Sequence, residues 1–275
     1  MPIGKSLRLR RLTSRGRAVI VAIDHGNVAG VVNGLEHPLE IVKMAAQNGA
    51  DGVLLTPGML ELVYEELGNL GVVLRLDGAA TVAGPPGPMR LFTSVEQAAE
   101  MGADAVVVNA TVGTPHEGEE LEKVGRVASE GRRWGVPVIA EMLTQGLLAN
   151  HLDFNGRGSE PLPVRAIDEI AMAARVGVEL GADFIKTRFA GDPDDFRRAA
   201  ASAGRPILVA GGPQRDHRLD GILRLVDHAL EGGAGGVVFG RQIWQSREPA
   251  EVLRAVCAMV HDDATVEEAL HATPV

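Results

Sequence analysis

One pattern recurs eight times along the 275-residue chain: a short run rich in β-branched residues, a glycine-rich or polar turn, and a stretch of helical periodicity. Strands that alternate with helices in this way lie parallel, in an open doubly wound sheet or in a closed barrel. Eight units favour the barrel, and the segment DHGNVAG after the first run lacks the glycine fingerprint of a dinucleotide-binding sheet. The sequence therefore predicts an α/β protein with a (β/α)8 TIM-barrel fold. The predicted strands cover residues 18–24, 52–56, 72–76, 105–110, 137–143, 184–189, 206–212 and 236–241.

The length of the chain fits one barrel domain. Residues 1–17 are rich in arginine and have the periodicity of a short helix, so we predict an N-terminal leader over 1–17 and a single TIM-barrel domain over 18–275. The connections 77–93 and 144–163 are longer than usual and follow predicted strands, which makes them candidate lids over a site.

Composition excludes several classes of function. The net charge of -9, the 3% aromatic content and the absence of a basic stripe after residue 17 argue against nucleic acid as a partner. No apolar run reaches the ~18 residues of a membrane span, and no export signal follows the basic N-terminus, so we expect a cytoplasmic protein that binds no membrane. The single cysteine, Cys257, lies in an amphipathic stretch and is expected to pack in the core. The histidines are scattered, and we predict neither a metal nor a cofactor.

In a barrel of this kind the active site lies at the carboxyl ends of the strands. The polar residues and glycines that end the predicted strands are therefore the first candidates for a site. They are Asp24, His25, Arg75, Asp77, Asn109, Glu141, Lys186, Arg188, Gly211, Gly212, Gly240 and Arg241.

Lys186 is the most informative of these residues. The chain has four lysines, and only Lys186 interrupts a strand that should be buried on both faces. Burial lowers the pKa of an amine, and a neutral amine is the nucleophile that forms a Schiff base with a carbonyl. A lysine that reaches solvent or pairs with an acid is the structural alternative. The alternation of a strand places Arg188 on the same side as Lys186, so that a fixed cation would lie beside the amine.

Asp24 has the same alternation as Ile20 and Ala22, which places it inside the mouth of the barrel. There it would take a proton from a ligand hydroxyl or hold Lys186, unless it only initiates the turn in Asp-His-Gly. His25 either contributes to phosphate binding or shapes this loop.

Glycines follow the last two strands, where barrels often bind phosphate through backbone N–H groups. Gly211 and Gly212 allow the backbone to approach an anion, and Gly240 precedes Arg241, which offers a guanidinium. The two glycine motifs together predict a phosphate site.

Several segments together are similar to a known family over most of the chain. They are GKSLRLRRL, IVAIDHG, GADAVVVNATVG, ELGADFIKT, VAGG and FGRQIWQSREPAEVLRAVCAMVH. The sequence resembles the DhnA-type class I aldolases, a family of archaeal-type fructose-bisphosphate aldolases, aminodideoxyheptulosonate synthases and a phosphorylated-dione thiolase. The resemblance implies a barrel that forms a homo-oligomer, a Schiff-base lysine matching Lys186 and an aspartate matching Asp24. It also implies a phosphate site that matches Gly211, Gly212, Gly240 and Arg241.

The sequence departs from the family pattern on the fifth strand. Family aldolases usually have a tyrosine there that donates or accepts a proton, whereas this chain has Leu143. Its only tyrosine, Tyr64, belongs to a helical pattern far from that strand end. Glu141, two residues before Leu143, is a candidate to take over the proton transfer if burial raises its pKa.

These observations predict a class I aldolase in which Lys186 forms an imine with a phosphorylated ketone, dihydroxyacetone phosphate. The aldehyde partner is either glyceraldehyde phosphate or aspartate semialdehyde. A coenzyme A-dependent thiolase acting on a phosphorylated dione is the first alternative, since that branch also lacks the tyrosine. A non-catalytic sugar-phosphate binding protein is the second alternative.

Overall fold

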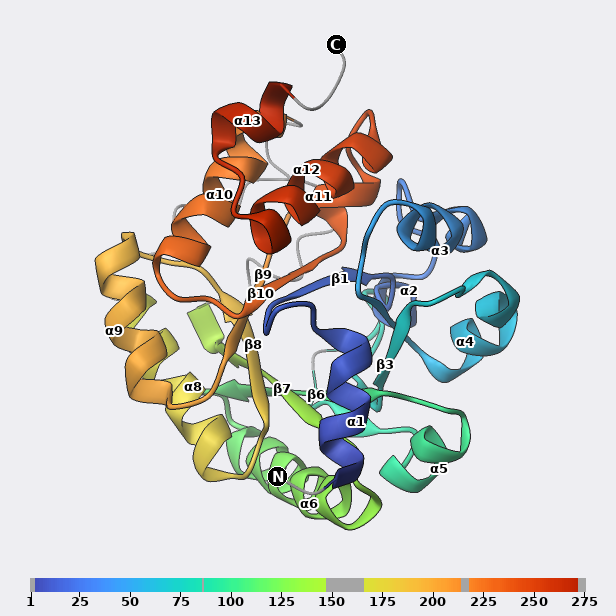
Figure 1. Ribbon diagram of the computed structural model, residues 1–275. Coiled ribbons are helices and arrows are strands. Elements are labelled where there is room, and N and C mark those ends of the chain that lie inside the picture. The colour runs from blue at the N-terminus through green and yellow to red at the C-terminus, as the bar shows by residue number, and fades with distance from the viewer. Residues whose placement is uncertain (1–2, 86, 147–165, 214–217, 272–275) are drawn as a thin grey trace.

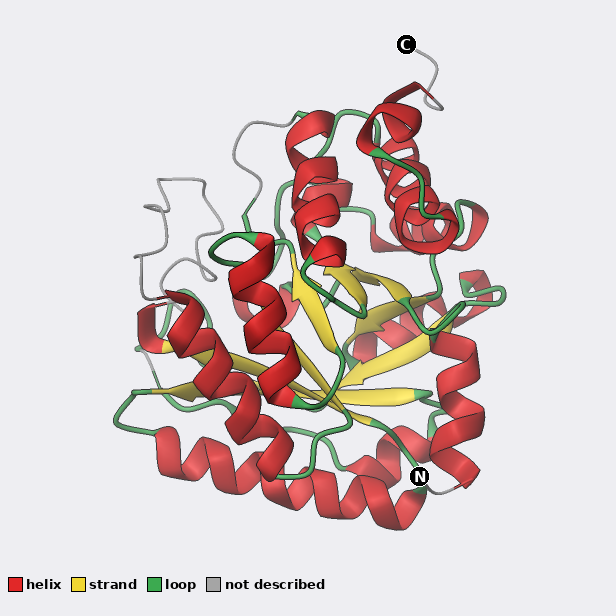
Figure 2. Ribbon diagram, turned by 60° about the vertical axis from the view of Figure 1, so that its left-hand side comes forward, coloured by secondary structure: helices red, strands yellow, loops and turns green. Residues whose placement is uncertain are grey.

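The computed structural model describes residues 3–85, 87–146, 166–213 and 218–271. Eight parallel strands close into a barrel in the order β1-β10-β9-β8-β7-β6-β3-β2, and helices surround it (Figures 1 and 2). Each of the eight predicted runs forms one strand, so the predicted (β/α)8 fold is confirmed. The barrel strands are β1 (Ala18–Ala22), β2 (Gly52–Leu55), β3 (Gly71–Arg75), β6 (Ala105–Val112), β7 (Val138–Thr144), β8 (Phe184–Arg188), β9 (Ile207–Ala210) and β10 (Gly236–Phe239).

Helices precede, connect and follow the strands. They are α1 (Ile3–Leu12), α2 (Gly26–Ala29), α3 (Pro38–Gln47), α4 (Pro57–Val63), the 3-10 helix η1 (Tyr64–Glu66), α5 (Val95–Glu100), α6 (Glu117–Trp134), α8 (Ala166–Glu179), α9 (Pro193–Ala203), α10 (Leu219–Glu231), α11 (Arg241–Trp244), α12 (Pro249–Asp262) and α13 (Val266–His271). The long connection 77–93 contains a small antiparallel pair, β4 (Asp77–Gly78) and β5 (Arg90–Leu91). Most of the other long connection, 144–163, lies outside the described residues.

The alternation of side chains divides each strand between two layers. Residues of one parity form the packed interior of the barrel, as Ile20, Val73 and Val107 do, whereas their neighbours Val21, Val72 and Val106 pack outward against the helices. The interior cluster is apolar and fills the amino-terminal half of the barrel. The polar ends of the same inward-facing rows therefore gather at the opposite, carboxyl-terminal mouth.

A repeated tripeptide, Gly-Ala-Asp, precedes β2, β6 and β8. Its aspartates Asp51, Asp104 and Asp183 each accept a backbone N–H from the neighbouring strand, at 2.7, 2.9 and 2.9 Å. Because each bond joins the start of one strand to a fixed residue of the next, the repeat holds the register of three strand pairs.

The helix α1 closes the amino-terminal end of the barrel. Leu12 joins the interior cluster, and a Cβ on Gly52 would lie 2.9 Å from its Cδ2 atom, so the glycine makes room for this leucine. The Lys5 ammonium donates to Asp183 at 2.6 Å, and both side chains are buried. The helix agrees with the periodicity predicted for residues 1–17, while the division into leader and barrel domain stays a prediction.

Cys257 lies on α12 and is buried. Burial, reinforced by the nearby carboxylates of Asp51 and Asp262, raises the pKa of its thiol to about 12. The thiol is therefore protonated at neutral pH, as expected for a residue of the core. Over the ranges that the structure describes, no helix has the length and apolar character needed to cross a membrane.

The buried ion pair of α1 leads to the first prediction. Replacing Lys5 with methionine (Lys5→Met) leaves the Asp183 carboxylate buried without its cation, so we expect the free energy of unfolding to fall by about 3–5 kcal/mol. Urea unfolding followed by circular dichroism measures the change. Lys43→Met, at an exposed helical position, is the matched control and is expected to change stability by less than about 0.5 kcal/mol. Equal effects of the two substitutions would contradict this role of Lys5.

Candidate active site

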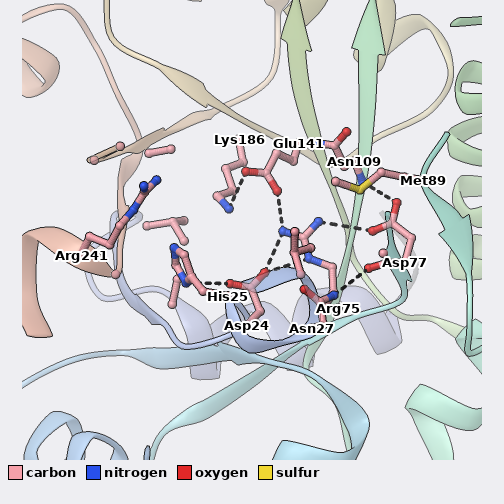
Figure 3. Close-up of a pocket in the computed structure, with 18 residues that line it drawn as sticks. Asp24, His25, Asn27, Arg75, Asp77, Met89, Asn109, Glu141, Lys186 and Arg241 are labelled. Carbon is pink, nitrogen blue, oxygen red and sulfur yellow. Dashed lines mark hydrogen bonds and ion pairs between the residues drawn. The ribbon is translucent and has the colours of Figure 1, made fainter. Parts of the chain in front are cut away.

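Polar side chains continue the interior rows of the barrel at its carboxyl-terminal mouth. Asn109, Glu141 and Lys186 are register partners on the adjacent strands β6, β7 and β8. Together with Asp24 and Arg75 they line a pocket whose wall also includes the backbone after β9 and β10 (Figure 3). The pocket lies where the sequence predicted the site, because the parity of each strand points these residues inward.

An ion network joins the residues of this pocket. The Lys186 ammonium lies 2.7 Å from Oε1 of Glu141, and the Arg75 guanidinium binds the other carboxylate oxygen, Oε2. Arg75 also donates to Asp24 at 2.8 Å and to Asp77 at 3.3 Å. One guanidinium therefore serves three carboxylates from three different strands or strand ends.

The network continues to Lys123 on α6. Its ammonium donates to Oδ2 of Asp77 at 2.6 Å and to the carbonyl of Met89 at 2.9 Å. The backbone N–H of Met89 in turn donates to Glu120 at 3.0 Å. These bonds fix the long connection 77–93 against α6, and Met89 lines the pocket.

In this network, burial and the neighbouring charges shift the pKa values of the ionisable groups in opposite directions. Burial disfavours the ionised form of Asp24, but Arg75 and Lys186 outweigh it, so the pKa of this carboxyl lies below its usual value. Burial likewise disfavours the charged form of Arg75, but Glu141, Asp24 and Asp77 raise the pKa of the guanidinium well above its usual value. Both groups are therefore ionised at neutral pH.

His25 follows Asp24 and lies beside Gly240, where an added Cβ would be 2.7 Å from its Cε1 atom. Burial lowers the pKa of its imidazole to about 4; Arg241 and Lys186 act in the same direction, and the carboxylate of Asp24 only partly opposes them. Its ring meets the Trp244 ring edge to face, with centroids 5.2 Å apart. His25 is thus a neutral imidazole at physiological pH, fixed by packing.

The predicted phosphate residues gather on the opposite side of Lys186 from Asn109 (Figure 3). Gly211, Gly212, Gly240 and Arg241 all line the pocket, and Arg241 is buried. Gly212 has a φ of +70°, and a Cβ there would overlap the guanidinium of Arg188. A Cβ on Gly240 would lie 2.7 Å from the carbonyl oxygen of Ala22. Both positions therefore require glycine, and phosphate binding stays a prediction.

The fifth predicted strand, β7, replaces the expected tyrosine with a core residue. Leu143 is fully buried in a small cluster with Ala166, Ile170 and Ala190. Tyr64 lies in η1 on the outside of the molecule and is 60% exposed, so it does not take the place of the missing tyrosine. Glu141 is the acid of β7 that faces Lys186, and its two carboxylate oxygens contact Lys186 and Arg75.

The sequence did not predict what every residue of the site does. Arg75, Asp77 and Asn109 were among the strand-end candidates but had no assigned role. Lys123, which binds Asp77, and Met89 and Asn27, which line the pocket, were not among the candidates. A signal for Lys123 was present, because it shares the spacing of the buried residues Val124 and Val127 on α6. Met89 and Asn27 had no such signal, since they lie in loop or short helix.

A family model, two relatives and a solved structure show which known proteins this chain is similar to. A model of the DeoC/LacD family of aldolases matches residues 18–246. The chain is 32% identical to the 2-amino-3,7-dideoxy-D-threo-hept-6-ulosonate synthase of Halobacterium salinarum, covering 97% of this chain and 95% of that protein. It is 30% identical to the class 1 fructose-bisphosphate aldolase of Thermoproteus tenax, covering 96% of this chain and 97% of the relative. A solved structure of a Schiff base-forming fructose-1,6-bisphosphate aldolase superposes with a TM-score of 0.80 at 30% identity, over 94% of this chain and 99% of that one.

The ion network leads to the second prediction. In Arg75→Met, three buried carboxylates lose their shared cation, and we expect the free energy of unfolding to fall by about 3–5 kcal/mol. Urea unfolding at pH 7 measures it, with Arg224→Met on the exposed face of α10 as the control. A fall of less than about 1 kcal/mol, as for an exposed ion pair, would contradict the central place of Arg75 in the network.

Proposed function

Because the chain belongs to the DeoC/LacD family of aldolases and is a class I, Schiff base-forming carbon–carbon lyase, we propose that it acts on a phosphorylated ketose. The proposed donor is dihydroxyacetone phosphate, and the acceptor is glyceraldehyde phosphate or aspartate semialdehyde. With glyceraldehyde phosphate the product is a fructose bisphosphate, the sugar for which the relative from Thermoproteus tenax is named. With aspartate semialdehyde the product is a 2-amino-4,5-dihydroxy-6-oxo-7-(phosphonooxy)heptanoate, for which a relative from Streptomyces griseus is named.

One observation supports this proposal above all others: the buried amine of Lys186 lies 2.7 Å from a carboxylate, between the glycine loops and the ion network. An amine that attacks a carbonyl must first lose its proton, and Glu141 is placed to take it. With the phosphate held at Gly211, Gly212, Gly240 and Arg241, the donor carbonyl reaches Lys186 on the adjacent strand.

The proposed reaction consists of imine formation, carbon–carbon bond formation and hydrolysis of the imine. The nitrogen of Lys186 bonds to the carbonyl carbon, the carbonyl oxygen leaves as water, and the protonated imine draws electrons from the neighbouring carbon. That carbon loses a proton to a carboxylate, bonds to the aldehyde carbon, and the aldehyde oxygen takes up a proton. Water then cleaves the imine and restores Lys186. Asp24, which is ionised at neutral pH, is the proposed base for the hydroxyl proton when the reaction runs toward cleavage.

Borohydride trapping with dihydroxyacetone phosphate tests the imine. We expect a reduced adduct on Lys186, identified by peptide mass spectrometry, because reduction converts the imine into a stable secondary amine. Lys186→Met is expected to give no adduct, whereas the control Lys43→Met keeps it. An adduct on Lys5, Lys43 or Lys123 instead, or none in the folded wild-type protein, would overturn the proposal.

The variant Glu141→Gln tests the proton acceptor. Glutamine keeps the shape but cannot take the proton of the ammonium, so we expect turnover to fall by about 10²–10⁴-fold. Initial rates and the rate of adduct formation on Lys186 are measured together, and both are expected to slow. The control Glu179→Gln, on the exposed end of α8, leaves both rates unchanged. Turnover of Glu141→Gln within about twofold of the wild-type rate would exclude this role.

We also propose that the chain assembles into a homo-oligomer, as the family resemblance implies.

A further inference from the structure

The pocket continues past Lys186, on the side away from the glycine loops. Arg241 and His25 lie on one side of Lys186, and Asn109, Met89 and Asp77 lie on the other (Figure 3). The strand order explains this arrangement, since β9 and β10 follow β8 in one direction around the barrel and β7, β6 and β3 follow it in the other. A donor held by its phosphate at β9 and β10 therefore leaves the Asn109 side of the pocket for the second substrate.

Asn109, on this side of the pocket, has a buried hydrogen-bonding atom to spare. Its side chain is 1% exposed, and its carbonyl oxygen Oδ1 accepts a bond from the Thr111 hydroxyl at 3.3 Å. Its amide nitrogen Nδ2 has no hydrogen-bond partner in the described part of the chain. A buried N–H donor without an acceptor costs free energy, so this atom is suited to a ligand oxygen.

The charged groups on this side of the pocket already form ion pairs with one another. Arg75 binds Asp77, Asp24 and Glu141, and Lys123 binds Asp77. The group that remains to recognise a ligand here is therefore a neutral amide, next to the apolar side chain of Met89. A neutral N–H donor recognises a hydroxyl or carbonyl oxygen.

The position of Asn109 distinguishes between these two oxygens. It lies two strands from Lys186 in the same register row, so the two backbones are about 10 Å apart. The reacting aldehyde carbon must bond to the carbon next to the imine, close to Lys186. The amide of Asn109 thus meets the substituent on the next carbon of the aldehyde instead of the reacting carbonyl.

We propose that Asn109 forms an acceptor subsite that selects 2-hydroxyaldehydes, by donating a hydrogen bond from Nδ2 to the hydroxyl on the carbon beside the aldehyde. The inference rests on the proposed function, since it requires a donor imine at Lys186. It distinguishes the two proposed acceptors, because glyceraldehyde phosphate has a hydroxyl at this carbon whereas aspartate semialdehyde has a methylene.

The test compares two aldehydes that differ in this hydroxyl alone: glyceraldehyde 3-phosphate and 3-oxopropyl phosphate, with dihydroxyacetone phosphate as donor. We expect the wild-type kcat/KM to favour the hydroxylated aldehyde about tenfold or more. In Asn109→Leu, of similar volume but without the donor, we expect the ratio to fall to about one, because kcat/KM with the hydroxylated aldehyde falls more than kcat/KM with 3-oxopropyl phosphate. Asn109→Ala provides a second variant that introduces no new bulk.

Borohydride trapping of the donor on Lys186, in the wild type and in both variants, separates the possible failures. No adduct in the wild-type protein means that the proposed function itself is wrong. An adduct with an unchanged ratio in both variants, or with no wild-type preference for the hydroxyl, overturns the Asn109 subsite alone. Wild-type turnover of aspartate semialdehyde but of neither test aldehyde overturns it as well.

Discussion

The contact of Arg75 with three carboxylates is the interaction on which the mouth of the barrel depends. A guanidinium offers five donors in a rigid plane, so it binds Asp24, Asp77 and Glu141 at once, which the three donors of a lysine would do less well. Asp24 follows β1, whereas Asp77 lies in β4 and Glu141 in β7. Because Arg75 holds one oxygen of Glu141, the other oxygen is left facing Lys186. The place of the amine is thus set by a cation three strands away.

Such a network is tolerated only where the rest of the fold keeps the strands fixed. Below it, the interior of the barrel is apolar and closed by Leu12 of α1. At the strand starts, the Gly-Ala-Asp repeats bind the neighbouring backbones and hold the register of β6 with β3 and of β8 with β7, and the second of these aligns Lys186 with Glu141. A slip of one residue would turn each of these side chains toward the helices. The strand register at the amino-terminal end of the barrel therefore determines which side chains face the pocket at the carboxyl-terminal end.

The sequence predicted what depends on local periodicity. Eight strand-like runs gave the barrel, and the parity of β1 and β8 placed Asp24 and Lys186 in its mouth. The pairing of Lys123 with Asp77 was out of reach, because it requires α6 and the connection 77–93 to meet, and no local pattern encodes that contact. The contact of Glu141 with Arg75 was out of reach for a similar reason, because it joins β7 to β3, which are not neighbours in the barrel.

The substitution of Leu143 for the family tyrosine follows from the same geometry. Leu143 packs with Ala166 and Ile170, so its position has become part of the core beneath α8. Glu141 lies two residues earlier on the same inward-facing row, deeper in the barrel, where Arg75 orients it and Lys186 lies within hydrogen-bond distance. A proton acceptor at this depth serves the amine directly, whereas Leu143 packs beneath α8 and is not among the residues that line the pocket. In the proposed reaction, Glu141 lies deeper in the barrel than the position of Leu143, so it transfers the proton during formation of the imine. Recognition of the acceptor is then left to residues of β6 and β3.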